Sequence, residues 1–168
     1  DTKRTIDDVR RAQDLGAVGI QVAPPVFNSP NQDDILRFFE AVSDGIEIGV
    51  IVYQTHWYPN GGVRAETFHR MADFEYIVAI KWSSWEGCPN EAVVGLAPKF
   101  NIFENSGDTS TREDFHRWGA RGFITNFAGA YPPHELKIWE LLEAGRYDEV
   151  RALSDAVDEP LMVVRDKI

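Results

Sequence analysis

The chain has 168 residues, of which 43% are hydrophobic and 12% aromatic, so it can form one sizeable core and is not a disordered segment. Its formal net charge of −10, from 17 basic and 27 acidic residues, argues against nucleic acid and anionic lipid as partners. One cysteine excludes an intramolecular disulfide framework, and no apolar run reaches the roughly 18 residues of a transmembrane helix. We therefore expect a single domain over residues 1–168 of a cytoplasmic protein.

Strand and helix patterns alternate along the whole chain. Short, continuously apolar runs predict strands, and segments with a helical spacing of apolar residues lie between them. In chain order we expect a helix over 5–15, a strand over 17–23, a helix over 33–43, a strand over 48–53, a helix over 65–72, a strand over 76–81, a helix over 91–96, a strand over 100–105, a helix over 111–118, a strand over 121–125, and helices over 132–142 and 147–157. We expect Thr109 or Ser110 to cap the helix that begins at Thr111.

Five such strand–helix units indicate a parallel sheet covered by helices. The sheet could be an open doubly wound one, or part of an eight-stranded (β/α)8 TIM barrel with about five of its eight units in this chain. No glycine-rich phosphate-binding loop follows any predicted strand, which weakens nucleotide-binding versions of the first fold. Polar residues at successive strand ends favour the barrel.

Reactive side chains stand at the carboxyl ends of these strands. The second predicted strand ends on the phenol of Tyr53, and the third ends on the amine of Lys81. The turn Ser106-Gly107-Asp108 and the pair Thr125-Asn126 follow at the ends of the next two strands. In a barrel of parallel strands all these ends open onto one site.

An amine and a phenol at neighbouring strand ends indicate imine chemistry on a carbonyl substrate. An amine attacks a ketone only in its neutral form, which burial at the end of an apolar strand favours. The protonated imine then eases carbon–carbon cleavage, condensation or loss of water, and a phenol can carry the protons. A solvated lysine and a tyrosine that merely plugs a strand end are the ordinary alternatives. Their joint placement nevertheless predicts Lys81 and Tyr53 as catalytic residues.

Other polar residues carry weaker signals. His56 follows the second strand and could be a general acid or base, or an ordinary loop histidine. The four histidines show no spacing typical of metal ligands, so we predict no metal site. Glu104 is expected to be either a buried carboxylate near the mouth or a solvated one. We interpret Cys88 as structural, and we expect Trp82 and Trp85 to pack under the helices.

The same residues resemble a known family. Tyr53, the run Ile77–Lys81, the turn Ser106–Asp108 and the run Gly122–Thr125 occur in an order and spacing similar to those of the dihydrodipicolinate synthase / N-acetylneuraminate lyase family. The segment 1–17 resembles that family's third helix and the turn after it. Members are class I, Schiff-base-forming aldolases and dehydratases on a (β/α)8 barrel.

The resemblance assigns roles to single residues. It implies that Lys81 forms the imine with pyruvate or a related 2-keto acid, while Tyr53 moves protons and contacts the keto-acid end. It places Ser106, Gly107 and Asp108 in a substrate-facing loop and Thr125 near the substrate. It also implies that the lysine imine makes a metal or organic cofactor unnecessary, and that the protein is a homo-oligomer, by family habit a tetramer.

Departures from the family pattern bear on the second substrate. The loop 25–27 has no hydroxyl where members commonly supply a relay tyrosine. Tyr58 stands where the synthase branch has an arginine for a second carboxylate, and tyrosine cannot make that bidentate charged contact. Tyr58, Trp57 and His56 could instead line a pocket for a less charged or aromatic substrate, although Trp57 could equally be interface packing.

The resemblance begins at the third helix, so we expect the chain to lack the family's first three strands, with its pyruvate-carboxylate segments, and the family's terminal helices. We therefore expect the chain to be a fragment of a longer enzyme, or only its ordered part. The alternatives left open are a sugar-acid dehydratase or aromatic hydratase-aldolase branch, and a non-catalytic binding or regulatory protein on a degenerate barrel.

Overall fold

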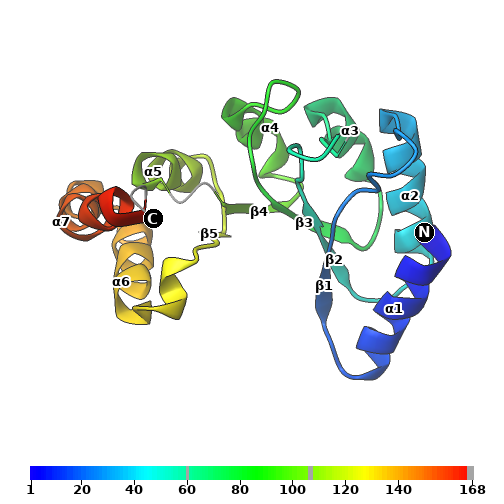
Figure 1. Cartoon of the computed structure of the whole chain (residues 1–168), viewed down its shortest axis with the longest axis horizontal. Helices are drawn as coiled ribbons and strands as arrows, with labels where there is room; N and C mark the ends of the chain where they lie inside the picture. Colours follow the sequence, from blue (N-terminus) through cyan, green and yellow to red (C-terminus); the bar gives the residue numbers. More distant parts are fainter. Residues whose placement is uncertain (60, 106–107, 166–168) are drawn as a thin grey trace.

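The structure of the chain is a computed structural model that describes residues 1–59, 61–105 and 108–165. Helices and strands alternate along it, as Figure 1 shows. The elements are α1 (Thr2–Asp14), β1 (Gly19–Val22), α2 (Gln32–Asp44), β2 (Gly49–Tyr53), α3 (Ala65–Met71), β3 (Ile77–Lys81), η1 (Asn90–Ala92), α4 (Val93–Leu96), β4 (Asn101–Glu104), α5 (Thr109–Arg117), β5 (Gly122–Phe123), η2 (Phe127–Gly129), α6 (Pro132–Glu143) and α7 (Tyr147–Arg165).

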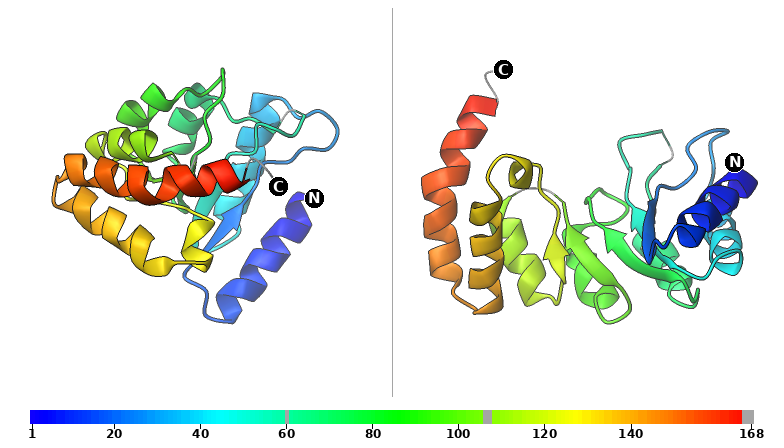
Figure 2. Two further views of the ribbon diagram at one scale, coloured as in Figure 1. Left: turned by 60° about the vertical axis from the view of Figure 1, so that its left-hand side comes forward. Right: turned by 90° about the horizontal axis from the view of Figure 1, so that it is seen from below.

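The five strands form one parallel sheet in the order β1-β2-β3-β4-β5. The strands follow one another as a curved row with helices along one side, α1 near its β1 end and α6 and α7 beyond β5 (Figures 1 and 2). The prediction of a parallel sheet covered by helices is confirmed. Among the described helices, none combines the length and the apolar character needed to cross a membrane.

Strand register separates two faces of the sheet. Val52, Ile80 and Ile102 are register partners on neighbouring strands, and each is fully buried on the helix-covered face. The next set of partners, Tyr53, Lys81 and Phe103, points to the opposite face, where all three are only half-buried. The sheet thus presents Tyr53 and Lys81 on its open face, because side chains alternate along a strand.

The main core lies between the sheet and α1 to α5, and a smaller apolar cluster joins α6 to α7. Trp82 is 2% exposed and packs between the rings of Phe68 and Phe115, at centroid distances of 6.5 and 5.9 Å. Trp85 is half-buried, and its indole N–H donates to the Val63 carbonyl at 3.2 Å. The prediction that Trp82 packs under the helices is confirmed, while Trp85 lies in the loop after β3 and is partly buried against the main core.

Several element boundaries differ from the sequence prediction. Helix α5 begins at Thr109, and its cap is Asp108, whose carboxylate accepts from the Ser110 amide at 3.1 Å, so the expected cap at Thr109 or Ser110 is wrong. The Thr109 hydroxyl is instead paired with Ser154 at 2.5 Å. Strand β5 is limited to Gly122–Phe123, shorter than the predicted 121–125, and α7 continues past the predicted end at 157.

Candidate active site

Lys81 and Tyr53 end adjacent strands and are register partners. The Lys81 Nζ atom lies 4.0 Å from the centroid of the Tyr53 ring, the geometry of a cation–π contact. The Gln54 amide donates to the Lys81 carbonyl at 3.2 Å, so the β2–β3 ladder continues just past both side chains and fixes their positions. The sequence predicts a buried amine at this strand end. Lys81 is only half-buried, because its face of the sheet carries no helices.

An aromatic cluster follows Tyr53. Its ring meets Trp57 edge-on at 5.5 Å, and Trp57 in turn contacts the rings of His56 and Tyr58 at 5.1 and 6.3 Å. Trp57 and Tyr58 are about half exposed, at 49% and 52%, so their rings are available to a ligand. The predicted pocket residues His56 and Tyr58 therefore lie in one cluster with the phenol beside Lys81.

Hydrogen bonds from the Gln54 side chain to the backbone tie the two ends of this aromatic loop together. The buried Gln54 amide exchanges two 2.8 Å bonds with the Val63 backbone across the loop. Gly61 lies so close to Thr55 that an added Cβ would meet the Thr55 carbonyl oxygen at 2.5 Å, which explains a glycine at this position. These contacts tie the described residues at the two ends of the loop together.

One ring nitrogen of His56 is buried and makes no hydrogen bond to the described residues. Its Nδ1 atom is shielded from solvent and has no hydrogen-bond partner among the described residues. A buried polar atom without a partner costs about 1–3 kcal/mol, which a bound ligand could recover. This feature is consistent with the predicted ligand contact at His56, and the sequence alone could not show it.

The second candidate loop is described only in part. Ser106 and Gly107 lie outside the described residues. Asp108 accepts hydrogen bonds from the Ser110 amide and from the hydroxyls of Ser110 and Thr111. Burial acts to raise the pKa of Asp108, but these hydrogen bonds outweigh it and hold the pKa below its usual range. Asp108 therefore remains a carboxylate at the start of α5.

Thr125 belongs to a buried ionic network. Its hydroxyl donates to Glu135 at 3.0 Å and accepts from the Phe127 amide at 3.0 Å. Arg112, 2% exposed, donates to the same Glu135 carboxylate at 3.0 Å, lies 3.7 Å from Glu104, and covers the ring of Phe123.

Glu104 corrects both expectations for this residue. It is 1% exposed, but it lies on the helix-covered face of the sheet next to Arg112, so it is neither at the mouth nor solvated. Sequence analysis missed Arg112 and Glu135. The signal that could have found Arg112 is its helical spacing from the buried residues Thr109 and Phe115, which places a charge on the buried side of α5.

A further polar cluster, His134, Glu135 and Asp158, has residue types that bind metals. Each member already has a protein partner: His134 Nε2 lies 2.7 Å from Asp158, which also accepts from Thr109, while Glu135 pairs with Arg112. The cluster therefore ties α6 to α7 and α5, and the expectation that no metal binds stays a prediction.

Cys88 is fully buried, and burial, together with the nearby charge of Glu66, raises the pKa of its thiol to about 12. The structural interpretation of Cys88 is consistent with this burial.

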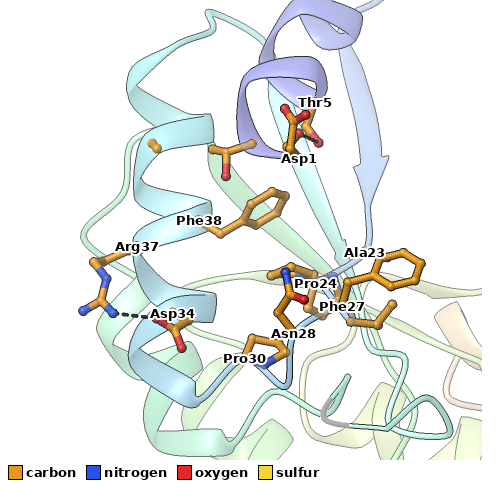
Figure 3. A pocket seen from close by; sticks show the side chains of 14 residues that line it. Asp1, Thr5, Ala23, Pro24, Phe27, Asn28, Pro30, Asp34, Arg37 and Phe38 are labelled. Atoms are coloured by element: carbon orange, nitrogen blue, oxygen red, sulfur yellow. Dashed lines mark hydrogen bonds and ion pairs between the residues drawn. The ribbon is translucent and has the colours of Figure 1, made fainter.

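A cavity of about 840 Å³ has a lining that does not include Lys81. It is bounded by the start of α1, the first half of α2 and the loop after β1, and Figure 3 shows Phe38, Pro24 and Asn28 around it. The Asp34–Arg37 ion pair, at 2.6 Å, stands at its edge. The cavity does not include the lysine–phenol pair, so the candidate active site rests on the strand ends instead.

Comparisons of the sequence and of the structure with known proteins point to the same family. A model of the Dihydrodipicolinate synthetase family matches residues 1–165. The chain is 26% identical over 161 residues to 4-hydroxy-tetrahydrodipicolinate synthase of Staphylococcus haemolyticus, covering 93% of this chain and 55% of that protein. A monomeric dihydrodipicolinate synthase variant superposes with a TM-score of 0.84 at 23% identity, covering 96% of this chain and 55% of that one. The enzyme of Acinetobacter baumannii, solved in complex with pyruvate, gives 0.81 at 22% identity, covering 92% and 53%.

These similarities cover part of each relative and support the predicted fold. The chain spans about half the length of the curated relatives it matches. The structural superpositions confirm the predicted partial (β/α)8 TIM barrel.

Proposed function

Because this chain belongs to the dihydrodipicolinate synthetase family, we propose that the protein is a class I lyase holding pyruvate or a related 2-keto acid as a Schiff base on Lys81. The observation that carries the proposal is the Lys81 amine lying 4.0 Å from the Tyr53 ring centre at two adjacent strand ends. An amine that forms an imine needs a proton-exchanging group close by, and a phenol is one.

The chemistry follows from that pair. The Lys81 nitrogen bonds to the keto carbon, and the former carbonyl oxygen is protonated and leaves as water, so that one proton is consumed and a protonated imine forms. This imine accepts the electron pair of a neighbouring carbon–carbon bond as an aldehyde departs, or stabilises the carbanion equivalent that adds to one. Loss of water at the adjacent position uses the same electron sink. Tyr53 donates and regains the protons.

The surrounding residues would bind the substrate. His56 and Tyr58 face it from the aromatic loop, and Ser106, Gly107 and Asp108 from the loop after β4. Thr125 borders it with its backbone and methyl group, since its only hydroxyl proton is donated to Glu135. The lysine imine is itself the electron sink, so the proposed reaction requires no metal or organic cofactor. We further propose a cytoplasmic homo-oligomer, tetrameric by family habit.

A specific observation favours a second candidate for the reaction partner. Trp57 and Tyr58 expose about half of their rings beside Tyr53, and neither can pair with a carboxylate as an arginine would. An aromatic or hydroxylated aldehyde, as in a hydratase-aldolase or sugar-acid dehydratase branch, therefore suits this wall better than a dicarboxylic one. A non-catalytic barrel is the alternative from another class.

Trapping the imine tests the proposal. The full-length protein is incubated with pyruvate and borohydride, and its mass is measured before and after digestion. We expect a reduced pyruvate adduct on Lys81, no adduct in Lys81→Ala, and a normal adduct in the control Lys99→Ala, which removes an exposed lysine. Tyr53→Phe should slow adduct formation by about 100-fold.

The outcomes separate the candidates. An unchanged adduct in Lys81→Ala would refute the role of Lys81, and the absence of any adduct in the wild-type protein would favour the non-catalytic alternative. Pyruvate-dependent consumption of benzaldehyde in preference to succinic semialdehyde would support the aromatic branch.

A further inference from the structure

The segment after β5 has little sheet to hold it. Among the described residues, strand β5 pairs with β4 through two register partners, Gly122 and Phe123, and one more backbone bond follows, from the Ile124 amide to the Glu104 carbonyl at 2.7 Å. Beyond that bond the chain turns into η2. A wall of the mouth that lies past the end of its strand needs another anchor to keep a fixed position.

The buried network supplies that anchor through a chain of side chains. It runs from Glu104, the last residue of β4, to Arg112 on α5, then to Glu135 on α6. From Glu135 it reaches the Thr125 hydroxyl at 3.0 Å, and that hydroxyl accepts from the Phe127 amide at the start of η2. The chain therefore joins the ends of two neighbouring strands through two helices.

Burial makes this chain stiff. The side chains of Arg112, Glu104 and Glu135 are 1%, 2% and 5% exposed, so water cannot replace a lost partner. Both oxygens of Glu135 are engaged, one by the guanidinium and the other by Thr125. A carboxylate held in this way by a buried cation fixes the direction of the Thr125 hydroxyl, since charge-assisted hydrogen bonds are short and directional.

We infer that Thr125, Glu135 and Arg112 form a positioning relay that sets the loop after β5 relative to Lys81. The inference rests on the proposed function and deepens it, because it names what holds one wall of the pyruvate site. Thr125 acts through its bond to Glu135 and does not touch the substrate with its hydroxyl. Lys81, two strands away, stays chemically competent when the relay is cut.

Substitutions at Thr125 test the relay while the buried Glu135 carboxylate keeps its ion pair with Arg112. In the full-length protein, Thr125→Val removes the hydroxyl at nearly constant volume, and Thr125→Ser retains it. Thr5→Val is the matched control, because Thr5 is a half-buried threonine on α1 that bonds only to a backbone carbonyl. The readouts are the pyruvate concentration for half-maximal borohydride-trapped adduct, the adduct at saturation, and deuterium uptake of residues 124–130.

A working relay gives a distinctive pattern. Thr125→Val should raise the half-saturating pyruvate concentration about tenfold, the equivalent of one hydrogen bond, with the saturated adduct unchanged and faster exchange over 124–130. Thr5→Val should stay within about twofold of the wild type. Thr125→Ser keeps the hydroxyl and loses only the methyl group that borders the substrate, so it should shift the half-saturating concentration much less than Thr125→Val does.

Contrary results are equally clear. A half-saturating concentration in Thr125→Val within twofold of the wild type, even with lowered stability, would show a purely structural network and overturn the inference. An equal shift in Thr125→Ser would trace the effect to shape instead of the hydroxyl and would overturn it as well. Absence of an adduct in the wild-type protein would instead defeat the proposed function itself, and the relay with it.

Discussion

Replacing Arg112 by methionine is expected to destabilise the folded protein by about 3–5 kcal/mol, because it strands buried charge. The guanidinium is 1% exposed and lies between Glu135 at 3.0 Å and Glu104 at 3.7 Å. Without it two carboxylates share a site that water does not reach. The contact with the Phe123 ring, 4.2 Å from the guanidinium carbon, accounts for a further part of the loss.

Urea unfolding of the full-length protein, followed by circular dichroism, measures this change. Arg117→Met is the matched control: that arginine, on the same helix, also pairs with a glutamate and covers a tyrosine ring, but its side chain is 50% exposed. It should cost less than about 1 kcal/mol. Combining Arg112→Met with Glu104→Gln and Glu135→Gln should recover much of the lost stability, since neither carboxylate is then left buried without its cation. Equal losses in Arg112→Met and Arg117→Met would refute the reasoning.

Two further predictions concern titrating groups. The pKa of Asp108 is lowered in the folded protein, so its contribution to stability is present above about pH 4 and is lost as the pH falls through the folded value. Asp108→Asn keeps a capping oxygen that cannot titrate. The Tm should therefore fall more steeply on acidification in the wild type than in Asp108→Asn. Equal slopes would contradict this. The raised pKa of Cys88, about 12, should leave its thiol unreactive toward a thiol reagent near pH 8 until denaturant is added, and full labelling of the native protein would count against the burial.

The parts of the fold that follow from local pattern could be predicted from the sequence. Tyr53 and Lys81 could be paired in advance because each closes a continuously apolar run, and parallel strands bring such ends to one edge of the sheet. The burial of Trp82 under the helices follows in the same way. It is one residue past Lys81, which lies on the open face of the sheet, so its side chain points to the opposite, helix-covered face.

The parts that depend on tertiary partners could not be predicted. Thr109 and Asp108 are both favoured cap residues, but the Thr109 hydroxyl is paired with Ser154 of α7, which no local pattern reveals. The sequence leaves the burial of Glu104 open, and the spacing of Arg112 on its helix indicates burial but names no partner. Only the fold brings them together with Glu135 from a third element and makes their burial tolerable.

The two walls of the mouth differ in how they are held, and this has a consequence for specificity. On the β2 side, the Gln54 side-chain amide ties the two ends of the aromatic loop together through two hydrogen bonds to the Val63 backbone, and the rings of Trp57 and Tyr58 take no part in these bonds. Lys81 is fixed separately by the strand ladder. Since neither support passes through the side chain of residue 58, that side chain can change without moving Lys81. In the proposed reaction, a tyrosine at position 58 would therefore alter the choice of aldehyde while Lys81 still forms the imine.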